Sequence, residues 1–134
     1  MSTLKVATIQ DTSGNNSSTP AGIASGTAKA WVNFNGTGTV SINDDFNVDS
    51  ITDNGTGDYT INFLNAMANA NYCVASTLAV ISDQGSTYGF GIHYTLNGPG
   101  TTNPTTKTTS ALRVLCRRES DNDMTNASVA IFGA

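Results

Sequence analysis

Between residues 28 and 74 the chain alternates apolar and polar side chains with a period of two, and the alternation stops at clusters rich in Gly and Asn. Successive side chains of a β-strand point to opposite faces, so this period predicts strands with one buried face. The clusters at residues 35–38 and 53–57 suit hairpin turns, because Asn and Gly accept positive φ angles. The stretch therefore predicts a series of short antiparallel strands.

The same kind of pattern continues to the C-terminus. Residues 72–81 are the most apolar run and are expected to form a central strand, whereas residues 97–109 are expected to form a long exposed loop. Residues 43–45 are expected to break a strand, and residues 64–71 to hold one helical turn. No helix of normal length is expected. The expected strands cover residues 28–34, 40–42, 46–51, 59–63, 72–81, 89–96, 111–117 and 127–132.

Eight or nine short strands at spacings of roughly ten residues predict an all-β protein, an antiparallel β-sandwich of jelly-roll-like form. Residues 1–27 differ from the rest, because they contain one strand-like run at 4–9, a polar loop at 10–20 and small residues at 21–27. Such a segment cannot bury itself. We therefore expect residues 1–27 to form an N-terminal arm for attachment or oligomer contacts, and residues 28–134 to form the sandwich.

The surface chemistry is neutral and polar. Charged residues make up 12% of the chain, and its polarity comes from 20 Thr, 15 Asn, 13 Ser and 13 Gly. A net charge of −4 gives nucleic acid no electrostatic basis for binding. Arg113, Arg117 and Arg118 lie near one strand. They are interpreted as solvated charge on a strand face, with an anion contact across a subunit interface as the alternative.

The residues that catalysis requires are scarce. His93 is the only histidine, and no nucleophile motif accompanies it. The single glutamate, Glu119, follows two arginines that favour its ionised form, which is wrong for the general acid of a glycosidase. We expect no catalytic residues and no enzyme, with a carbohydrate-active enzyme domain as a remote alternative.

Metal and cofactor sites are not expected either. The carboxylates at residues 44–45, 53–58 and 121–123 lack the ligand spacing of a calcium loop and are interpreted as turn residues. One histidine and two separated cysteines are too few for a zinc site. Cys73 and Cys116 are expected to be buried free thiols, with a disulfide between them as the alternative.

One edge of the sandwich is a candidate recognition site. Tyr88 borders the polar loop at residues 82–86, where its ring could stack on a sugar. Phe90, His93 and Tyr94 follow on the next expected strand. No apolar run has the length of a signal peptide or a membrane span, so we expect synthesis in the cytoplasm and no membrane insertion.

Several sequence blocks resemble a module of bacteriophage virion proteins, especially the tail-fibre-like proteins of marine phages. The blocks are LKVATIQDTSGNNSSTP at 4–20, AKAWVNFNGTGTV at 28–40, SITDNGTGDYTINF at 50–63 and NANYCV at 69–74, together with Arg113-Val114 and AIFG at 130–133. The resemblance covers nearly the whole chain.

The resemblance implies a β-rich, typically homotrimeric virion protein, made in the host cytoplasm and exposed on a fibre. The implied partners are other copies of the chain, further virion proteins bound through the arm, and host surface polysaccharide. Tail-fibre proteins normally carry a shaft before this module, whereas about 27 residues precede it here, so a capsid-decorating protein is the alternative. The aromatic residues expected to fill the core are Trp31, Phe34, Tyr59, Phe63 and Tyr72.

Overall fold

The computed structural model describes residues 2–79, 91–93, 107–117 and 123–133. These residues form one short helix followed by eight strands. The elements are α1 (Pro20–Gly26), β1 (Ala28–Asn35), β2 (Ser41–Phe46), β3 (Val48–Gly55), β4 (Asp58–Phe63), β5 (Cys73–Ala79), β6 (Gly91–His93), β7 (Ala111–Arg117) and β8 (Asn126–Phe132).

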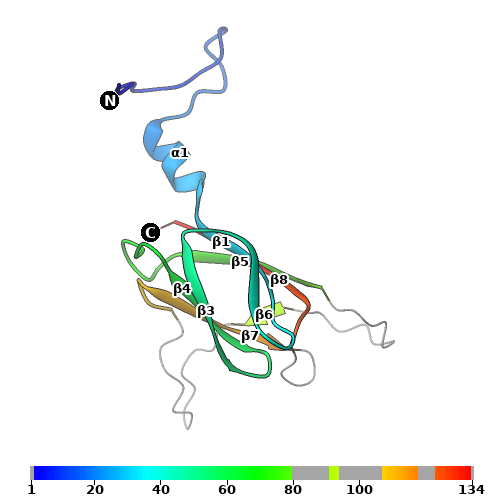
Figure 1. Cartoon of the computed structure of the whole chain (residues 1–134). Coiled ribbons are helices and arrows are strands. Elements are labelled where there is room, and N and C mark those ends of the chain that lie inside the picture. The colour runs from blue at the N-terminus through cyan, green and yellow to red at the C-terminus, as the bar shows by residue number, and fades with distance from the viewer. Residues whose placement is uncertain (1, 80–90, 94–106, 118–122, 134) are drawn as a thin grey trace.

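The strands form two antiparallel sheets that pack face to face (Figure 1). One sheet has the order β2-β1-β8-β5 and is called the β1 sheet below; the other has the order β3-β4-β7-β6 and is called the β4 sheet. All pairs of neighbouring strands are antiparallel. The predicted all-β sandwich is therefore confirmed.

The core lies between the two sheets and is built by strict alternation. In β1 and β4 every second residue is buried, and the same alternation continues in β8. Burying each large apolar side chain contributes about 1.5–3 kcal/mol, so these central strands carry most of the hydrophobic stabilisation. The four central strands contribute to this core Ala30, Val32, Phe34, Tyr59, Ile61, Phe63, Leu112, Val114, Cys116, Ala127, Val129 and Ile131.

Tyr59 joins the two sheets at one end of the core. Its ring packs edge to face on Phe34, with 5.2 Å between the ring centroids. Its hydroxyl lies 2.7 Å from Asp123 Oδ1 and 2.9 Å from the Gly36 carbonyl oxygen, so a single proton serves two acceptors. The Gly57 amide donates to the same Asp123 oxygen at 2.8 Å. Burial, followed by the hydrogen bond to Asp123, raises the pKa of Tyr59.

Tyr72 plays a similar part at the other end of the core. Its ring packs edge to face on Phe63 at 5.9 Å, and its hydroxyl is 3.1 Å from the carbonyl oxygens of Thr108 and Ala111. Lys107 Nζ lies 4.5 Å from the centre of the Tyr72 ring and donates to the Tyr72 carbonyl at 2.5 Å. Burial raises the pKa of Tyr72 to about 12.

The turn predicted at residues 53–57 joins β3 to β4. Gly55 and Gly57 have φ angles of 133° and 67°, values that residues with a Cβ rarely adopt. Asp53 Oδ1 accepts a hydrogen bond from the Gly55 amide at 2.9 Å. This aspartate therefore acts as the turn residue that the sequence predicted.

Several local expectations were wrong. Residues 4–9 form no strand; Ile9 makes a single bridge to Ser18, because no longer partner segment lies beside it. Part of the small-residue run forms α1, which begins with Thr19 as its N-cap and Pro20 in its first turn. Residues 43–45 lie inside β2, where a bulge accommodates them, and residues 64–71 contain no helical turn.

The run at 72–81 forms β5, which is an edge strand rather than a central one. It pairs with β8 alone, and its alternation leaves Cys73 exposed. Both cysteines are free, and Cys116 is buried in the core, so the expectation of a buried thiol fails for Cys73 only. Of the run at 89–96 only β6 is described, and residues 97–106 of the expected loop lie outside the described residues.

Candidate interaction surface

The outer face of the β4 sheet carries polar side chains that form hydrogen bonds with one another. Asn62 Nδ2 donates to Ser50 Oγ at 3.2 Å and to Thr52 Oγ1 at 3.0 Å across the β3–β4 pair. Arg113 donates through Nε and Nη2 to the two Asp58 oxygens at 2.8 and 2.5 Å, and these hydrogen bonds raise the pKa of Arg113. These groups suit this part of the face to water, whereas Leu115, on the same side of β7, is buried. For Arg113, an ion pair within the chain replaces the predicted solvated charge.

The outer face of the β1 sheet is different, because an apolar row crosses all four strands. Trp31 is paired with Phe46 on one side and with Ala130 on the other, and Ala130 is paired with Ala75. Phe46 is 53% exposed, and Trp31 is half-buried. Directly opposed side chains on one face of a sheet lie about 4.5–5.5 Å apart at Cβ. The four residues therefore form one continuous apolar strip.

A neutral polar row runs beside this strip. Asn33 Nδ2 donates to Ser128 Oγ at 2.7 Å and to Asn126 Oδ1 at 2.6 Å, while Asn33 Oδ1 accepts from Asn43 Nδ2 at 2.8 Å. Thr77 continues the row, since it is paired with Ser128. These amides and hydroxyls are uncharged, and at the β2 edge the row ends with the exposed carboxylate of Asp44, which is paired with Asn33.

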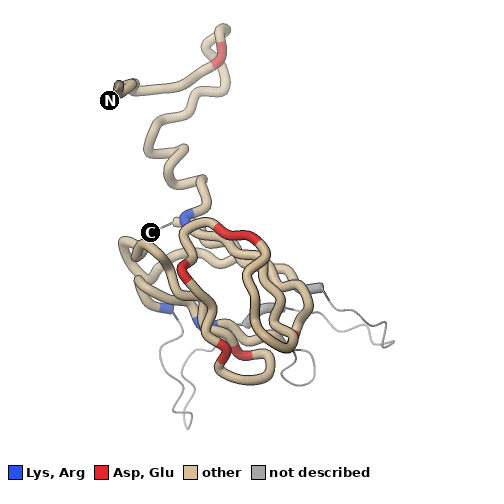
Figure 2. The backbone as a smooth tube through the Cα atoms, viewed as in Figure 1, with Lys and Arg blue, Asp and Glu red and all other residues tan. Residues whose placement is uncertain are grey.

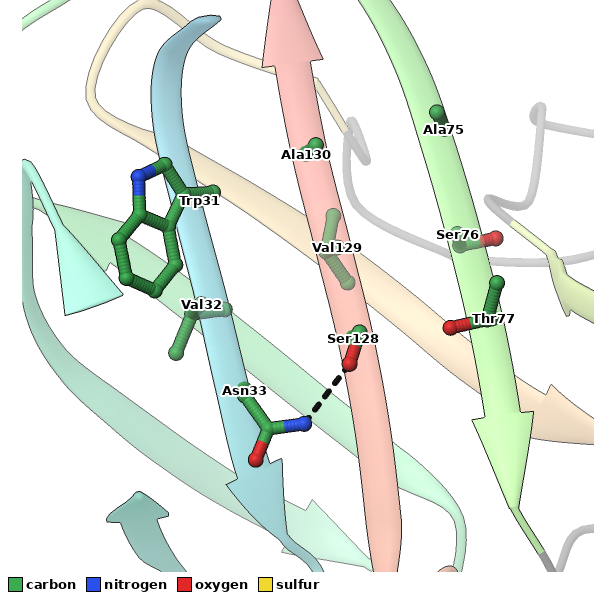
Figure 3. Close-up of a pocket in the computed structure, with 9 residues that line it drawn as sticks. All are labelled: Trp31, Val32, Asn33, Ala75, Ser76, Thr77, Ser128, Val129 and Ala130. Carbon is green, nitrogen blue, oxygen red and sulfur yellow. Dashed lines mark hydrogen bonds between the residues drawn. The ribbon is translucent and has the colours of Figure 1, made fainter. Parts of the chain in front are cut away.

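A shallow groove of about 300 Å³ runs along these two rows. Its floor is low because Ala75, Ala130 and Ser128 are small, whereas Trp31 stands beside it on β1 (Figure 3). No residue that lines the groove is charged. We call the groove together with Phe46 the contact face. The groove is lined by Trp31, Val32, Asn33, Ala75, Ser76, Thr77, Ser128, Val129 and Ala130.

The N-terminal arm is the second uncovered part of the chain. Residues 2–27 are all exposed, and the arm runs away from the sandwich (Figure 1). Its own folding is local: Asp11 Oδ1 accepts from the amides of Ser13 and Asn15 at 3.0 and 2.8 Å, and the Thr19 hydroxyl accepts from the Gly22 amide at 3.0 Å. The arm thus has a shape of its own without packing on the domain.

The arm curves beside a wide-open apolar hollow of about 550 Å³, which we call the arm concavity. Its large apolar residues remain open to solvent, with Leu4 85%, Val6 40%, Ile9 52% and Ile23 43% exposed. Soluble monomers rarely gather this many exposed apolar residues at one place without a partner. The concavity is lined by Leu4, Lys5, Val6, Ile9, Pro20, Ile23 and Ala24.

The junction between arm and sandwich is tied by hydrogen bonds. The Thr27 amide and hydroxyl both donate to the Ile23 carbonyl, at 3.0 and 2.7 Å. Lys29 Nζ, at the start of β1, donates to the Ala24 carbonyl at 2.7 Å. The Thr27 bonds close the C-terminal turn of α1, and the Lys29 bond links that turn to β1, so the helix leaves the sandwich in a defined direction.

The predicted recognition residues are only partly described. Tyr88, Phe90 and Tyr94 lie outside the described residues, and His93 is described only as a backbone position of β6 paired with Leu115. The recognition edge expected at these four residues therefore stays a prediction. Arg117 is likewise described through its backbone alone.

Trp31 is the residue that sequence reasoning misplaced. It was expected in the core with Phe34, Tyr59, Phe63 and Tyr72; the other four are buried, but Trp31 lies on the contact face. The signal was present, because the period of two places Trp31 on the face opposite Val32 and Phe34.

Within the described ranges, no three His, Cys, Asp or Glu side chains come together as a metal site. The described part also contains no helix that is long and apolar enough to cross a membrane. Comparison of the chain with protein-family models, with curated proteins and with solved structures finds no match.

Proposed function

We propose that the chain is a non-enzymatic structural protein of a bacteriophage virion, of the tail-fibre type, and that its N-terminal arm fastens it into an assembly. The proposal combines the motif blocks at residues 4–20, 28–40 and 50–63 with the geometry of the arm. In this role the sandwich is the exposed body, and the arm is the part that other subunits cover.

The observation that carries the proposal is the exposure of the arm. Leu4 and Ile9 place most or half of their side-chain surface in water, although the same chain has a well-filled core. Covering a side chain of this size contributes about 1.5–3 kcal/mol, so a partner surface would gain stability by taking up the arm. An exposed apolar segment of this kind is expected in a subunit that is covered by its neighbours in an assembly, and not in an enzyme or a binding module that diffuses freely.

A capsid-decorating protein is the second candidate. The same arm, leaving one end of a small compact domain (Figure 1), would also suit attachment to a shell. The two candidates differ in the number of copies that a particle carries, because a shell repeats its decoration sites far more often than a tail repeats its fibres.

The test is quantitative mass spectrometry of purified particles, followed by localisation of the subunit by cryo-electron microscopy. We expect the protein in the particle at a few to a few dozen copies, at the tail. Hundreds of copies on the head would favour the decoration role. Absence from purified particles would refute both candidates.

A further inference from the structure

We propose that the arm of one copy docks on the contact face of a second copy, with the arm concavity taking up Phe46 and Trp31. The proposed function requires that the arm be covered, and this inference, which rests on it, names the covering partner. The occupant of the contact face is thus another copy of this chain.

Shape supports this pairing. The arm offers a hollow of about 550 Å³, whereas the contact face offers the adjacent aromatic side chains of Phe46 and Trp31. Phe46, at the end of β2, is among the most exposed large apolar side chains of the described sandwich. An aromatic side chain entering an apolar hollow is the usual core of a protein interface. The contact face thus supplies the protruding aromatic side chains, and the arm supplies the apolar hollow that can take them up.

Charge supports it as well. The concavity contains one cation, Lys5, between Leu4 and Val6. Asp44 and Asp45 directly precede Phe46, are exposed and form no ion pair with any described residue. Figure 2 shows this acidic stretch at the end of the sandwich from which the arm leaves. Asp44 is paired with Asn33 and so shares the outer face with Phe46, whereas Asp45 is paired with the core residue Val32 and lies on the other face of β2. Docking therefore brings Lys5 towards the Asp44 carboxylate, which favours this register over others.

The arm has enough exposed surface to extend the contact beyond the concavity. Standard protein interfaces use roughly 20–30 residues on each side. The concavity would form the centre of such an interface, and the rest of residues 2–27, all exposed, is available for its rim.

The arm is expected to reach a neighbour rather than its own contact face. Folding back would require α1 to turn at its junction with β1, where Thr27 and Lys29 hold the carbonyls of Ile23 and Ala24. Those bonds keep α1 directed away from the sandwich (Figure 1). Arm-to-face docking is a heterologous contact, which closes into a ring when the rotation allows it. The expected homotrimer is one such ring.

The first experiment measures self-association of the full chain by sedimentation equilibrium. We expect the wild-type chain to associate, and expect Leu4→Asp or Phe46→Asp to raise the dissociation constant at least tenfold. Ser13→Asp adds the same charge to the arm outside the concavity, and Thr52→Asp adds it to the opposite outer face, so both controls should associate as the wild type does. All four sites are exposed, and circular dichroism verifies folding.

Mixing identifies the pairing. Leu4→Asp keeps an intact contact face, and Phe46→Asp keeps an intact arm, so an equimolar mixture should form a heterodimer that neither variant forms alone. Trp31 is the only tryptophan, and its emission should shift to shorter wavelength as the heterodimer forms. Lys5→Asp should weaken association, and combining it with Asp44→Lys should restore it.

Three outcomes would overturn the inference. The first is a wild-type chain that stays monomeric at its highest soluble concentration. The second is an oligomer that Phe46→Asp leaves intact, which would indicate arm-to-arm packing. The third is Trp31 emission that responds to a neutral oligosaccharide but never to protein concentration, which would indicate a sugar site. A monomer found in virions refutes this inference alone, whereas a self-associating chain absent from virions refutes the proposed function alone.

Discussion

Removing the Tyr59 hydroxyl tests the hydrogen-bonded junction at one end of the core. In Tyr59→Phe the ring keeps its edge-to-face contact with Phe34, so the change isolates the bonds to Asp123 and Gly36. A hydrogen bond to a charged group contributes about 1.5–3 kcal/mol. Asp123 is exposed and keeps the Gly57 amide as a donor, so water and that amide replace part of the loss. We expect the free energy of unfolding to fall by about 1.5–2 kcal/mol.

Tyr72→Phe is the matched control. Tyr72 is equally buried and also packs edge to face, but its hydroxyl meets two neutral carbonyls at 3.1 Å. The Ala111 carbonyl also accepts from the Thr108 amide at 2.9 Å, so it is not left without a donor. Loss of a neutral hydrogen bond costs about 0.5–1.5 kcal/mol, and we expect the lower half of that range.

The assay is urea unfolding followed by circular dichroism and Trp31 emission. The dependence of the unfolding free energy on urea should stay constant, because neither variant changes the buried surface appreciably. The melting temperature should fall by roughly 4 °C per kcal/mol. If Tyr59→Phe costs no more than Tyr72→Phe, the reasoning that the Asp123 carboxylate strengthens this junction is wrong.

Three further predictions concern Gly36, the two cysteines and the titration of Tyr72. Gly36→Ala should destabilise the fold, as measured by urea unfolding, because the added Cβ would lie 2.7 Å from Cζ of the Tyr59 ring and that ring is held in the core. With a maleimide, Cys73 should react in the native state, whereas Cys116 should react only on unfolding, as counted by mass spectrometry. The pKa of Tyr72 is raised from 10 to about 12, so the folded state holds this proton more tightly than the unfolded state. The resulting stability is fully present below pH 10 and should be lost between pH 10 and about 12. In urea unfolding measured across that window, Tyr72→Phe should lose less stability with rising pH than the wild type does, and the raised pKa of Tyr59 accounts for part of the dependence that remains.

The strands were predictable because their signal is local. In β1, β4 and β8 the period of two and the buried face coincide residue by residue, and the turn at Gly55 and Gly57 lies where the Asn and Gly cluster placed it. The order of the strands was harder to predict from the sequence, because β5 is more apolar than its position at a sheet edge requires. Its order depends on pairing with β8 about 50 residues later, which no local pattern encodes.

The candidate site was harder to predict than the strands. Residues of the arm could be assigned an attachment role from composition, because a polar segment with scattered apolar residues cannot bury itself. The contact face has no such signature. Trp31, Phe46, Ala75 and Ala130 come from four strands, and they become neighbours only when β1 pairs with both β2 and β8, and β8 with β5.

The two outer faces explain why the contact face escapes a sequence motif. Both sheets have alternating strands with similar neutral residues, yet Asn62 and Arg113 on the β4 sheet are bonded to neighbours on their own face. On the β1 sheet, Ala75 and Ala130 supply no polar group and little bulk, so the groove forms beside Trp31. An alanine at an exposed strand position gives no sequence signal of a binding surface. Here two alanines in adjacent strands, next to an aromatic pair, are what make the surface available to a partner.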